Sequence, residues 1–351
     1  MIRYRTSTTG DVTDDGSLMS VSISRRAALG GLGAATAALM VGKPAEAAVS
    51  GTDSISATYQ QEKAKAGGTW HAHIAGVDAT GTPVPIVEDD ADHVTQGYSV
   101  QKLAVATAVM DKIDRGELTL GQKLDLPADI ILGGSGIYFL HTVWGDEITI
   151  ANFLTAMLLV SDNTAVRMCG RVVPAAEINE ILAAKGFVNT RVEPVANPNR
   201  FYLGTTTPRE MHDLLWRLAT KTLLSPQSCT FLLSITRWIN GYMDGVRRVM
   251  SSEERSRVAT KYGADFNTLG ASRHEAGIMF GPDGLPKLTY AMFAEGLGDL
   301  DNYGSTHPAV QAHSVIGRTM LDNLPTGAPA AAAARAARAE KLVPFKPVNG
   351  G

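Results

Sequence analysis

The order in which strand-like and helix-like patterns follow one another restricts the fold of this chain more than any other feature. Two strand-like runs come early, separated by the turn-forming residues 79–82, and are expected to open the folded domain as a β-hairpin. Three more come late, and between the two groups apolar residues recur at the helical spacing of three or four. We therefore expect an α+β fold in which both chain ends share one sheet and a mostly helical lobe spans about residues 94–224. The expected strands are 69–78, 83–87, 256–261, 277–280 and 287–295, and the expected helices are 100–113, 150–160, 175–184, 207–219, 224–241 and 307–324.

The N-terminus has the layout of an export signal. Arg25 and Arg26 precede a Gly/Ala-rich apolar run, and a small-x-small cleavage pattern follows at residues 45–47. This order resembles a twin-arginine signal, whereas the alternative, a membrane anchor, needs about 20 apolar residues. We expect the twin-arginine export machinery to recognise residues 1–48, which are then removed, and the mature protein to be secreted or periplasmic.

The rest of the chain divides into a folded domain at residues 49–324 and an Ala-, Pro- and Arg-rich low-complexity tail at 325–351. Its charges nearly balance, with a formal net charge of −3 for the whole chain, which argues against nucleic acid as a partner and favours a small-molecule substrate. No second apolar stretch is long enough for stable membrane insertion, and we expect a monomer.

Cys169 and Cys229 either form a disulfide, which export permits, or are two unpaired buried thiols.

Ser99 and Lys102 stand three positions apart at the start of the first expected helix. This spacing puts two side chains on one helix face within mutual reach, so a neutral lysine there is able to accept the serine proton. The unpaired N–H groups and the dipole of the helix N-terminus stabilise the oxyanion that forms after attack. Alone, S-x-x-K is a weak pattern, and a serine near a helix cap beside a solvated lysine is the simpler interpretation.

A second pattern supports the catalytic interpretation. Ser161, Asp162 and Asn163 follow an apolar helix and open another helical segment, and by themselves they are a good helix cap. S-x-x-K followed by S-D-N is the shared signature of serine β-lactamases and penicillin-binding proteins, which this chain therefore resembles. The resemblance covers essentially the whole folded domain, and it implies a serine β-lactamase-like fold with an antiparallel sheet flanked by helices and with Ser99 as the nucleophile.

Two further segments narrow the resemblance to the class A β-lactamases. Residues 191–197 look like the Ω-loop of that family, in which a glutamate and an asparagine hold the water that hydrolyses the acyl-enzyme; the matching residues here are Glu193 and Asn197. Without the other motifs, Glu193 would be interpreted as an exposed loop carboxylate. Lys261 and Gly263 match the family's K-T-G or K-S-G strand, which lines the cleft.

Tyr262 stands where that family has a small hydroxyl residue that helps to bind the carboxylate of penicillins. The phenol either substitutes for this hydroxyl or blocks its place, so the replacement bears on the substrate more than on acylation. The resemblance also implies that the backbone N–H groups of Ser99 and Ala264 form the oxyanion hole. Arg273 either supplies a substrate-binding guanidinium or is an exposed arginine at a strand end.

Two histidines and two tyrosines lie outside these motifs. His71 and His73 alternate on one face of the first expected strand, but no third ligand has a helpful spacing. We therefore interpret both as ordinary strand residues and expect no metal site. Tyr98 and Tyr138 either line the cleft or pack in the core or on the surface.

These motifs predict a secreted serine hydrolase, and the resemblance implies that it opens β-lactam rings. Ser99 would attack the amide carbonyl, with Lys102 or a water on Glu193 as the base. Ser161 and Lys261 would relay a proton to the leaving nitrogen. No metal or organic cofactor is required.

The remaining roles follow from the same resemblance. Asn163 would position the substrate, and Glu193 with Asn197 would activate the deacylating water.

Two alternative functions stay open. One is a related serine esterase or amidase with a non-β-lactam substrate, which Tyr262 favours. The other is a penicillin-recognising protein that stays acylated, against which the presence of Glu193 argues.

Overall fold

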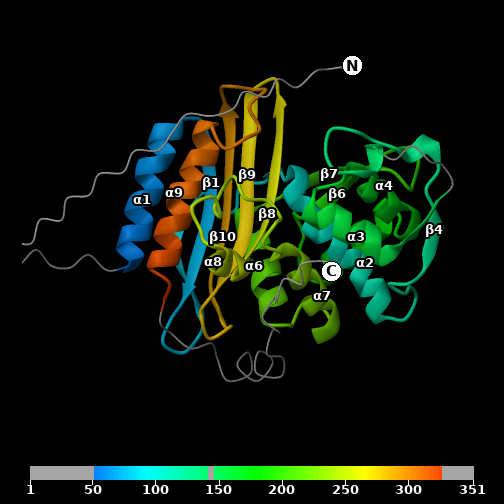
Figure 1. Cartoon of the computed structure of the whole chain (residues 1–351), viewed down its shortest axis with the longest axis horizontal. Coiled ribbons are helices and arrows are strands. Elements are labelled where there is room, and N and C mark those ends of the chain that lie inside the picture. The colour runs from blue at the N-terminus through cyan, green and yellow to red at the C-terminus, as the bar shows by residue number, and fades with distance from the viewer. Residues whose placement is uncertain (1–50, 141–145, 326–351) are drawn as a thin grey trace, which may run out of the picture. The chain divides into compact units, whose positions relative to one another are not determined.

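The computed structural model describes residues 51–140 and 146–325 of the chain (Figure 1). They belong to one compact unit. The export signal predicted at 1–48 lies outside the described residues, as does the predicted tail apart from Pro325. Both therefore stay predictions.

A five-stranded antiparallel sheet has the strand order β2-β1-β10-β9-β8. Early and late parts of the chain share it, as the sequence predicts. In its register, His71 of β1 lies opposite Phe293 of β10, and Ala264 of β8 lies opposite Arg273 of β9. The strands are β1 (Thr69–Val77), β2 (Pro83–Asp89), β8 (Val258–Asn267), β9 (Gly270–Phe280) and β10 (Pro286–Leu297).

Helices cover both faces of this sheet. On one face, α1 (Gly51–Ala66) and α9 (Pro308–Asp322) lie side by side (Figure 1), and Met292 of β10 belongs to the core beneath them. On the other face, α6 (Pro208–Ala219) contacts β1, β9 and β10, and Phe293 belongs to a second core. Because side chains alternate along a strand, apolar cores on both faces explain why β10 is a nearly continuous apolar run.

The helix α1 precedes the hairpin of β1 and β2, so the expectation that this hairpin opens the folded domain is wrong. The cause is the composition of α1, which buries only Ile55, Tyr59 and Glu62 and lacks an apolar stripe. Its helical form depends on tertiary contacts. It packs against α9, and the Tyr59 hydroxyl donates to Asp89 Oδ2 at 2.7 Å.

The middle of the chain forms the helical lobe around α2 (Lys102–Asp114), in which residues 102–110 are all buried. Thr149 and Asp162 cap the next two helices by accepting backbone N–H groups. Short strands form a three-stranded sheet, β3-β7-β6, and the pair β4-β5. The remaining elements are β3 (Thr95–Gln96), β4 (Lys123–Asp125), β5 (Glu147–Thr149), α3 (Ile150–Leu159), α4 (Asn163–Val172), α5 (Ala175–Ala184), β6 (Arg191–Pro194), β7 (Phe201–Thr206), α7 (Pro226–Thr236) and α8 (Ser252–Ser256).

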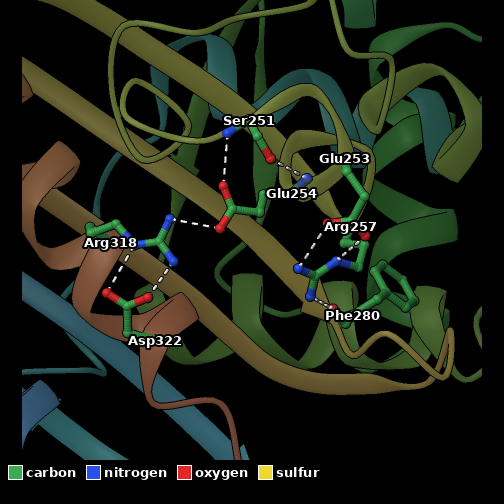
Figure 2. A network of polar contacts seen from close by, with 7 residues as sticks. All are labelled: Ser251, Glu253, Glu254, Arg257, Phe280, Arg318 and Asp322. Carbon is green, nitrogen blue, oxygen red and sulfur yellow. Dashed lines mark hydrogen bonds and ion pairs between the residues drawn. The ribbon is translucent and has the colours of Figure 1, made fainter. Parts of the chain in front are cut away.

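A polar network ties the short helix α8 to α9 (Figure 2). Ser251 and Glu254 form a capping box at the start of α8. Arg318 of α9 donates to Glu254 Oε1 at 2.9 Å and pairs with Asp322. The hydrogen bond from the Ser251 backbone and the Arg318 guanidinium lower the pKa of Glu254 to about 2.

The two cysteines do not pair. Cys169 and Cys229 are both free and buried, so of the two alternatives left open by the sequence, unpaired thiols are confirmed. Among residues 51–140 and 146–325, no helix combines the length and the apolar character that a membrane span needs.

Candidate active site

Ser99 lies in a 3₁₀ turn, Tyr98–Gln101, that leads directly into α2. Tyr98 adopts a left-handed backbone conformation with φ of 45°, a conformation that non-glycine residues adopt only rarely and at a cost. The turn brings the chain from β3 to the N-terminal end of α2. Ser99 therefore lies in front of a helix N-terminus, as the sequence predicts, with its side chain only partly buried.

His274 of β9 supports this turn from behind. Its Nδ1 accepts the Ala294 N–H at 3.2 Å, so Nε2 carries the proton and donates to the Gln96 carbonyl at 3.1 Å. The His274 ring also packs against the Tyr98 ring, with centroids 5.4 Å apart. Burial lowers the pKa of His274 to about 4, which keeps the ring neutral and its tautomer fixed.

Two buried lysines donate to the same hydroxyl oxygen. Lys102 Nζ lies 3.1 Å from Ser161 Oγ, and Lys261 Nζ lies 2.9 Å from it. Lys102 also donates to the Ser161 carbonyl and, at 2.8 Å, to Asn163 Oδ1. Because Ser161 Oγ accepts from both lysines, its own proton is available to a third group.

Burial makes both lysines lose a proton more easily than an exposed lysine does. Burial lowers the pKa of Lys102 to about 7, against the opposing effect of the Asp162 carboxylate. Burial also lowers the pKa of Lys261 far below its ordinary value, and the charge on Lys102 lowers it further. At neutral pH the site therefore holds a neutral amine within hydrogen-bonding distance of Ser161, as proton transfer requires.

The S-D-N turn organises one wall of the site. Ser161 has a left-handed backbone with φ of 57°. The Asp162 carboxylate accepts the N–H groups of Ile137 and Tyr138, at 2.6 and 2.8 Å, as well as capping α4. The Asn163 amide donates to the Gly133 carbonyl at 3.0 Å. The motif thus holds the 133–138 loop at the site.

The strand β8 forms the opposite wall and lies against Ser99. Lys261, Gly263 and Ala264 follow one another on this strand, and Ala264 and Ser99 line the same cleft. A Cβ atom on Gly263 would lie 2.8 Å from the Val100 nitrogen, so only glycine allows this approach. The backbones that the resemblance assigns to an oxyanion hole are therefore adjacent.

The segment expected to be an Ω-loop is a β-hairpin. Glu193 lies on β6, exposed and paired with Tyr202 of β7, and it lines the cleft. The buried Gln101 amide donates to the Arg191 and Thr205 carbonyls, which ties both strands to the turn that carries Ser99. Asn197 is not brought to the site.

Asn197 lies at the exposed tip of this hairpin. Its Oδ1 accepts the Asn199 N–H at 3.0 Å, and it is absent from the residues that line the cleft. A local turn uses the asparagine oxygen, and the structure does not join Asn197 to Glu193, so their shared water stays a prediction. The expected helix start after the hairpin is found at Thr207, which caps α6.

Tyr262 lines the cleft and is held at both ends. Its ring stacks on Tyr242 with centroids 4.3 Å apart and planes 6° from parallel, and its hydroxyl donates to the Tyr303 carbonyl at 3.3 Å. Burial raises its pKa above the ordinary tyrosine value. The phenol is therefore a neutral, anchored part of the wall.

Arg273 has neither of the two roles that the sequence suggested. It is fully buried on β9, and its five N–H groups all donate to backbone carbonyls, those of Asp265, Ser272, Leu300 and Asn302, at 2.8–3.1 Å. Nothing is left for a substrate, and it is not an exposed strand-end arginine. Its physical role is to attach the loop that carries Tyr303 to the sheet, and the guanidinium also lies 4.5 Å from the Tyr303 ring centroid.

Ser99, Ser161, Asn163, Glu193, Tyr262 and Ala264 line one cleft of about 850 Å³. Tyr98 lines it as well, whereas Tyr138 packs against the core. Two arginines that line the cleft, Arg167 of α4 and Arg200 before β7, are not indicated by any sequence pattern. Arg167 donates to the Ile130 and Ile131 carbonyls, and Arg200 to that of Asp129. Neither belongs to a motif, so only the fold reveals them.

Several solved structures with this fold are named β-lactamases, and one is named PBP-A. A β-lactamase from Sphaerobacter thermophilus DSM 20745 has a TM-score of 0.61 at 22% identity, covering 77% of this chain and 96% of its own. One from Xanthomonas campestris pv. campestris str. ATCC 33913 has a TM-score of 0.63 at 20% identity, covering 78% and 98%. A mutant of PBP-A, described as an acyl-enzyme complex with penicillin G, has a TM-score of 0.60 at 20% identity, covering 77% and 96%. No curated protein is significantly similar in sequence.

The fold is thus that of the serine β-lactamases, with an antiparallel sheet flanked by helices and a helical lobe. The model of the β-lactamase enzyme family matches residues 54–324. This chain belongs to that family.

Proposed function

We propose that this protein hydrolyses β-lactams through an acyl-enzyme on Ser99. The observation that carries the proposal is the pair of buried lysines on one serine hydroxyl, in a cleft that Ser99 also lines. The relative PBP-A, named as an acyl-enzyme with penicillin G, adds support for acylation of a serine by this class of compound.

In the acylation step, neutral Lys102 accepts the Ser99 Oγ proton as Oγ bonds to the carbonyl carbon. The oxyanion lies between the backbone N–H groups of Ser99 and Ala264. As the C–N bond breaks, the Ser161 hydroxyl gives its proton to the leaving nitrogen and takes one back from Lys102 or Lys261. A water on Glu193 is the alternative first base.

In the deacylation step, Glu193 accepts a proton from water while the water oxygen attacks the ester carbonyl, and Ser99 Oγ leaves with a proton returned through Lys102. Asn197 is omitted from this step because its oxygen caps a turn. Glu193 is exposed on its strand and so is able to take water from solvent.

The test is hydrolysis of a chromogenic cephalosporin and of benzylpenicillin by the mature protein, with Ser99→Ala and Glu193→Gln beside it. We expect turnover by the wild type, none by Ser99→Ala, and a persistent adduct in the mass spectrum of Glu193→Gln. A folded wild type that neither turns over nor forms an adduct would rule out β-lactams as substrates.

The anchored phenol of Tyr262 and the enclosed Arg273 favour one second candidate, a serine esterase or amidase with another substrate. Neither group presents a free hydroxyl or guanidinium for a penicillin carboxylate. In that case a fluorophosphonate probe would label the wild type but not Ser99→Ala, and activated esters would be hydrolysed while β-lactams would not.

We further propose that the protein acts outside the cytoplasm after twin-arginine export. The proposal depends on Arg25, Arg26 and the apolar run that follows them. Expression of the full chain with both arginines changed to lysine should leave the precursor in the cytoplasm, whereas the wild-type chain should be processed and exported. Equal export of both chains would contradict it.

A further inference from the structure

Two imidazoles and a carboxylate converge at the edge of the sheet, outside the cleft. His71 lies on β1, Asp90 directly follows β2, and His93 lies in the short segment before β3. His71 Nδ1 is 3.0 Å from Asp90 Oδ2, and His93 Nδ1 is 3.3 Å from the same oxygen. The two rings stack with centroids 3.8 Å apart and planes 4° from parallel.

The contacts among these three groups leave a buried nitrogen unsatisfied. His71 is 4% exposed, and its Nδ1 makes no hydrogen bond of acceptable geometry, although the Asp90 oxygen is close to it. A buried polar atom without a partner is costly. Its position beside a second Nδ1 and a carboxylate oxygen is the arrangement that a bound cation would stabilise.

The separations match those between the ligands of a tetrahedral metal ion. Zinc bonds to imidazole nitrogen and carboxylate oxygen are about 2.0–2.2 Å long, so two ligand atoms at tetrahedral angles are about 3.3 Å apart. The observed nitrogen–oxygen separations of 3.0 and 3.3 Å are close to this value. Because the two rings are stacked and parallel, the exposed His93 ring has to turn out of the stack before both Nδ1 lone pairs point at one ion. All three ligand atoms lie within 4.8 Å of one another.

A second carboxylate lies behind the buried histidine. Glu295 Oε2 is 3.8 Å from His71 Nε2, and Thr95 Oγ1 donates to Glu295 Oε1 at 2.5 Å. Metal-binding histidines commonly direct the other ring nitrogen to a carboxylate, which fixes the tautomer and leaves the ligating nitrogen deprotonated. Glu295 is the carboxylate nearest to His71 Nε2, and at 3.8 Å it would have to move closer to form this hydrogen bond.

We propose that His71, Asp90 and His93 form a binding site for a divalent transition-metal ion, Zn²⁺ above all. Two imidazoles and one carboxylate suit zinc, whereas calcium and magnesium prefer oxygen ligands only. Asp90 and His93 have side chains that are 61% and 43% exposed, so the ion exchanges with solvent and water completes its coordination. The site is separate from the serine chemistry and requires none of it.

The test uses untagged, EDTA-treated protein, equilibrium dialysis against Zn²⁺, and the visible absorption of Co²⁺ as a reporter of coordination. We expect one ion per chain and an absorption spectrum typical of tetrahedral Co²⁺. Zn²⁺ should also raise the melting temperature of the wild type, because it binds the folded state.

The variants are Asp90→Asn, which keeps the shape of a side chain on a backbone with φ of 45°, and His93→Gln at an exposed position. The matched control is Asp92→Asn in the same segment, where the carboxylate pairs with Arg209 instead. Asp90→Asn and His93→Gln should bind Zn²⁺ at least about tenfold more weakly, with unchanged metal-free melting, while Asp92→Asn binds like the wild type. Absence of binding by the wild type, or unchanged affinity in both Asp90→Asn and His93→Gln, would overturn the proposal.

Discussion

Gly263 of β8 lies so close to Ser99 that a Cβ atom on it would be 3.0 Å from the Ser99 nitrogen. Backbone atoms cannot yield as the end of a flexible side chain does. The contact therefore makes the position of the nucleophile turn depend on the absence of one methyl group.

The first prediction is that Gly263→Ala slows acylation of Ser99 by about 100-fold, because displacing an oxyanion-hole donor costs about that much. Single-turnover kinetics with a chromogenic cephalosporin would measure it. Gly121→Ala is the matched control, since its Cβ would meet nothing within 4 Å. An unchanged acylation rate in Gly263→Ala would show that the turn adjusts freely.

The second prediction concerns pH. Burial lowers the pKa of Lys102 to about 7, so the neutral amine, the form that acts as a base, dominates above that value. The acylation rate should rise with pH through about 7 and then level off. Lys102→Met should lose this rise of the rate with pH, together with most of the rate itself, while Glu193→Gln should keep the rise. If Glu193→Gln removed the rise with pH instead, the first base would be the water on Glu193.

The third prediction is that Tyr262→Thr raises kcat/KM for benzylpenicillin, by about tenfold, because a small hydroxyl replaces the anchored phenol in the cleft wall. The loss of the stack on Tyr242 should cost about 0.5–1.5 kcal/mol of unfolding free energy, measured by urea titration. Tyr262→Phe is the control: it keeps the stack and removes only the bond to the Tyr303 carbonyl. Equal kinetics in the threonine and phenylalanine variants would assign the effect to that bond.

The fourth prediction concerns acid stability. The pKa of Glu254 is about 2 in the folded chain, below the ordinary value of about 4.3. A depressed carboxylate stabilises the fold above its unfolded pKa, and this contribution is lost as the pH falls from about 4.3 towards 2. Glu254→Gln should lower the free energy of unfolding near neutral pH by about 1 kcal/mol or less. It should also make this free energy depend less on pH between about 2 and 4.3. Urea unfolding at several pH values, with Glu253→Gln beside it, would measure the difference.

The motif residues that the structure brings together as the sequence predicts share one property, which is that local spacing determines their geometry. Ser99 and Lys102 lie three apart at a helix start, and Ser161 lies between the end of α3 and the Asp162 cap of α4. Such spacings persist whatever the rest of the chain does. The sheet was predictable for a similar reason, since both groups of strands carry strong apolar patterns.

Contacts that the sequence does not indicate depend on distant parts of the chain. Arg273 is buried because carbonyls of the 300–302 segment, far along the chain, turn towards it. His71 gains its partners from Asp90 and His93 only once β1 and β2 are paired. Asn197 matches a family motif by position, but the hairpin β6-β7 carries it away from the cleft. The identity of a residue alone does not indicate which distant groups its side chain contacts.

The way Arg273 holds its loop has a consequence for how this protein diversifies. The guanidinium binds main-chain oxygens, including those of Leu300 and Asn302, and main-chain oxygens are present whatever side chain follows them. Position 300 is therefore free to change residue type without weakening the anchor, whereas the Asn302 side chain shapes the loop through its bonds to Asp299 and Gly304. Tyr303, at the rim of the cleft, is held by the same attachment. New side chains can be presented to new substrates on a support that stays the same, so the range of compounds accepted can evolve separately from the stability of the fold.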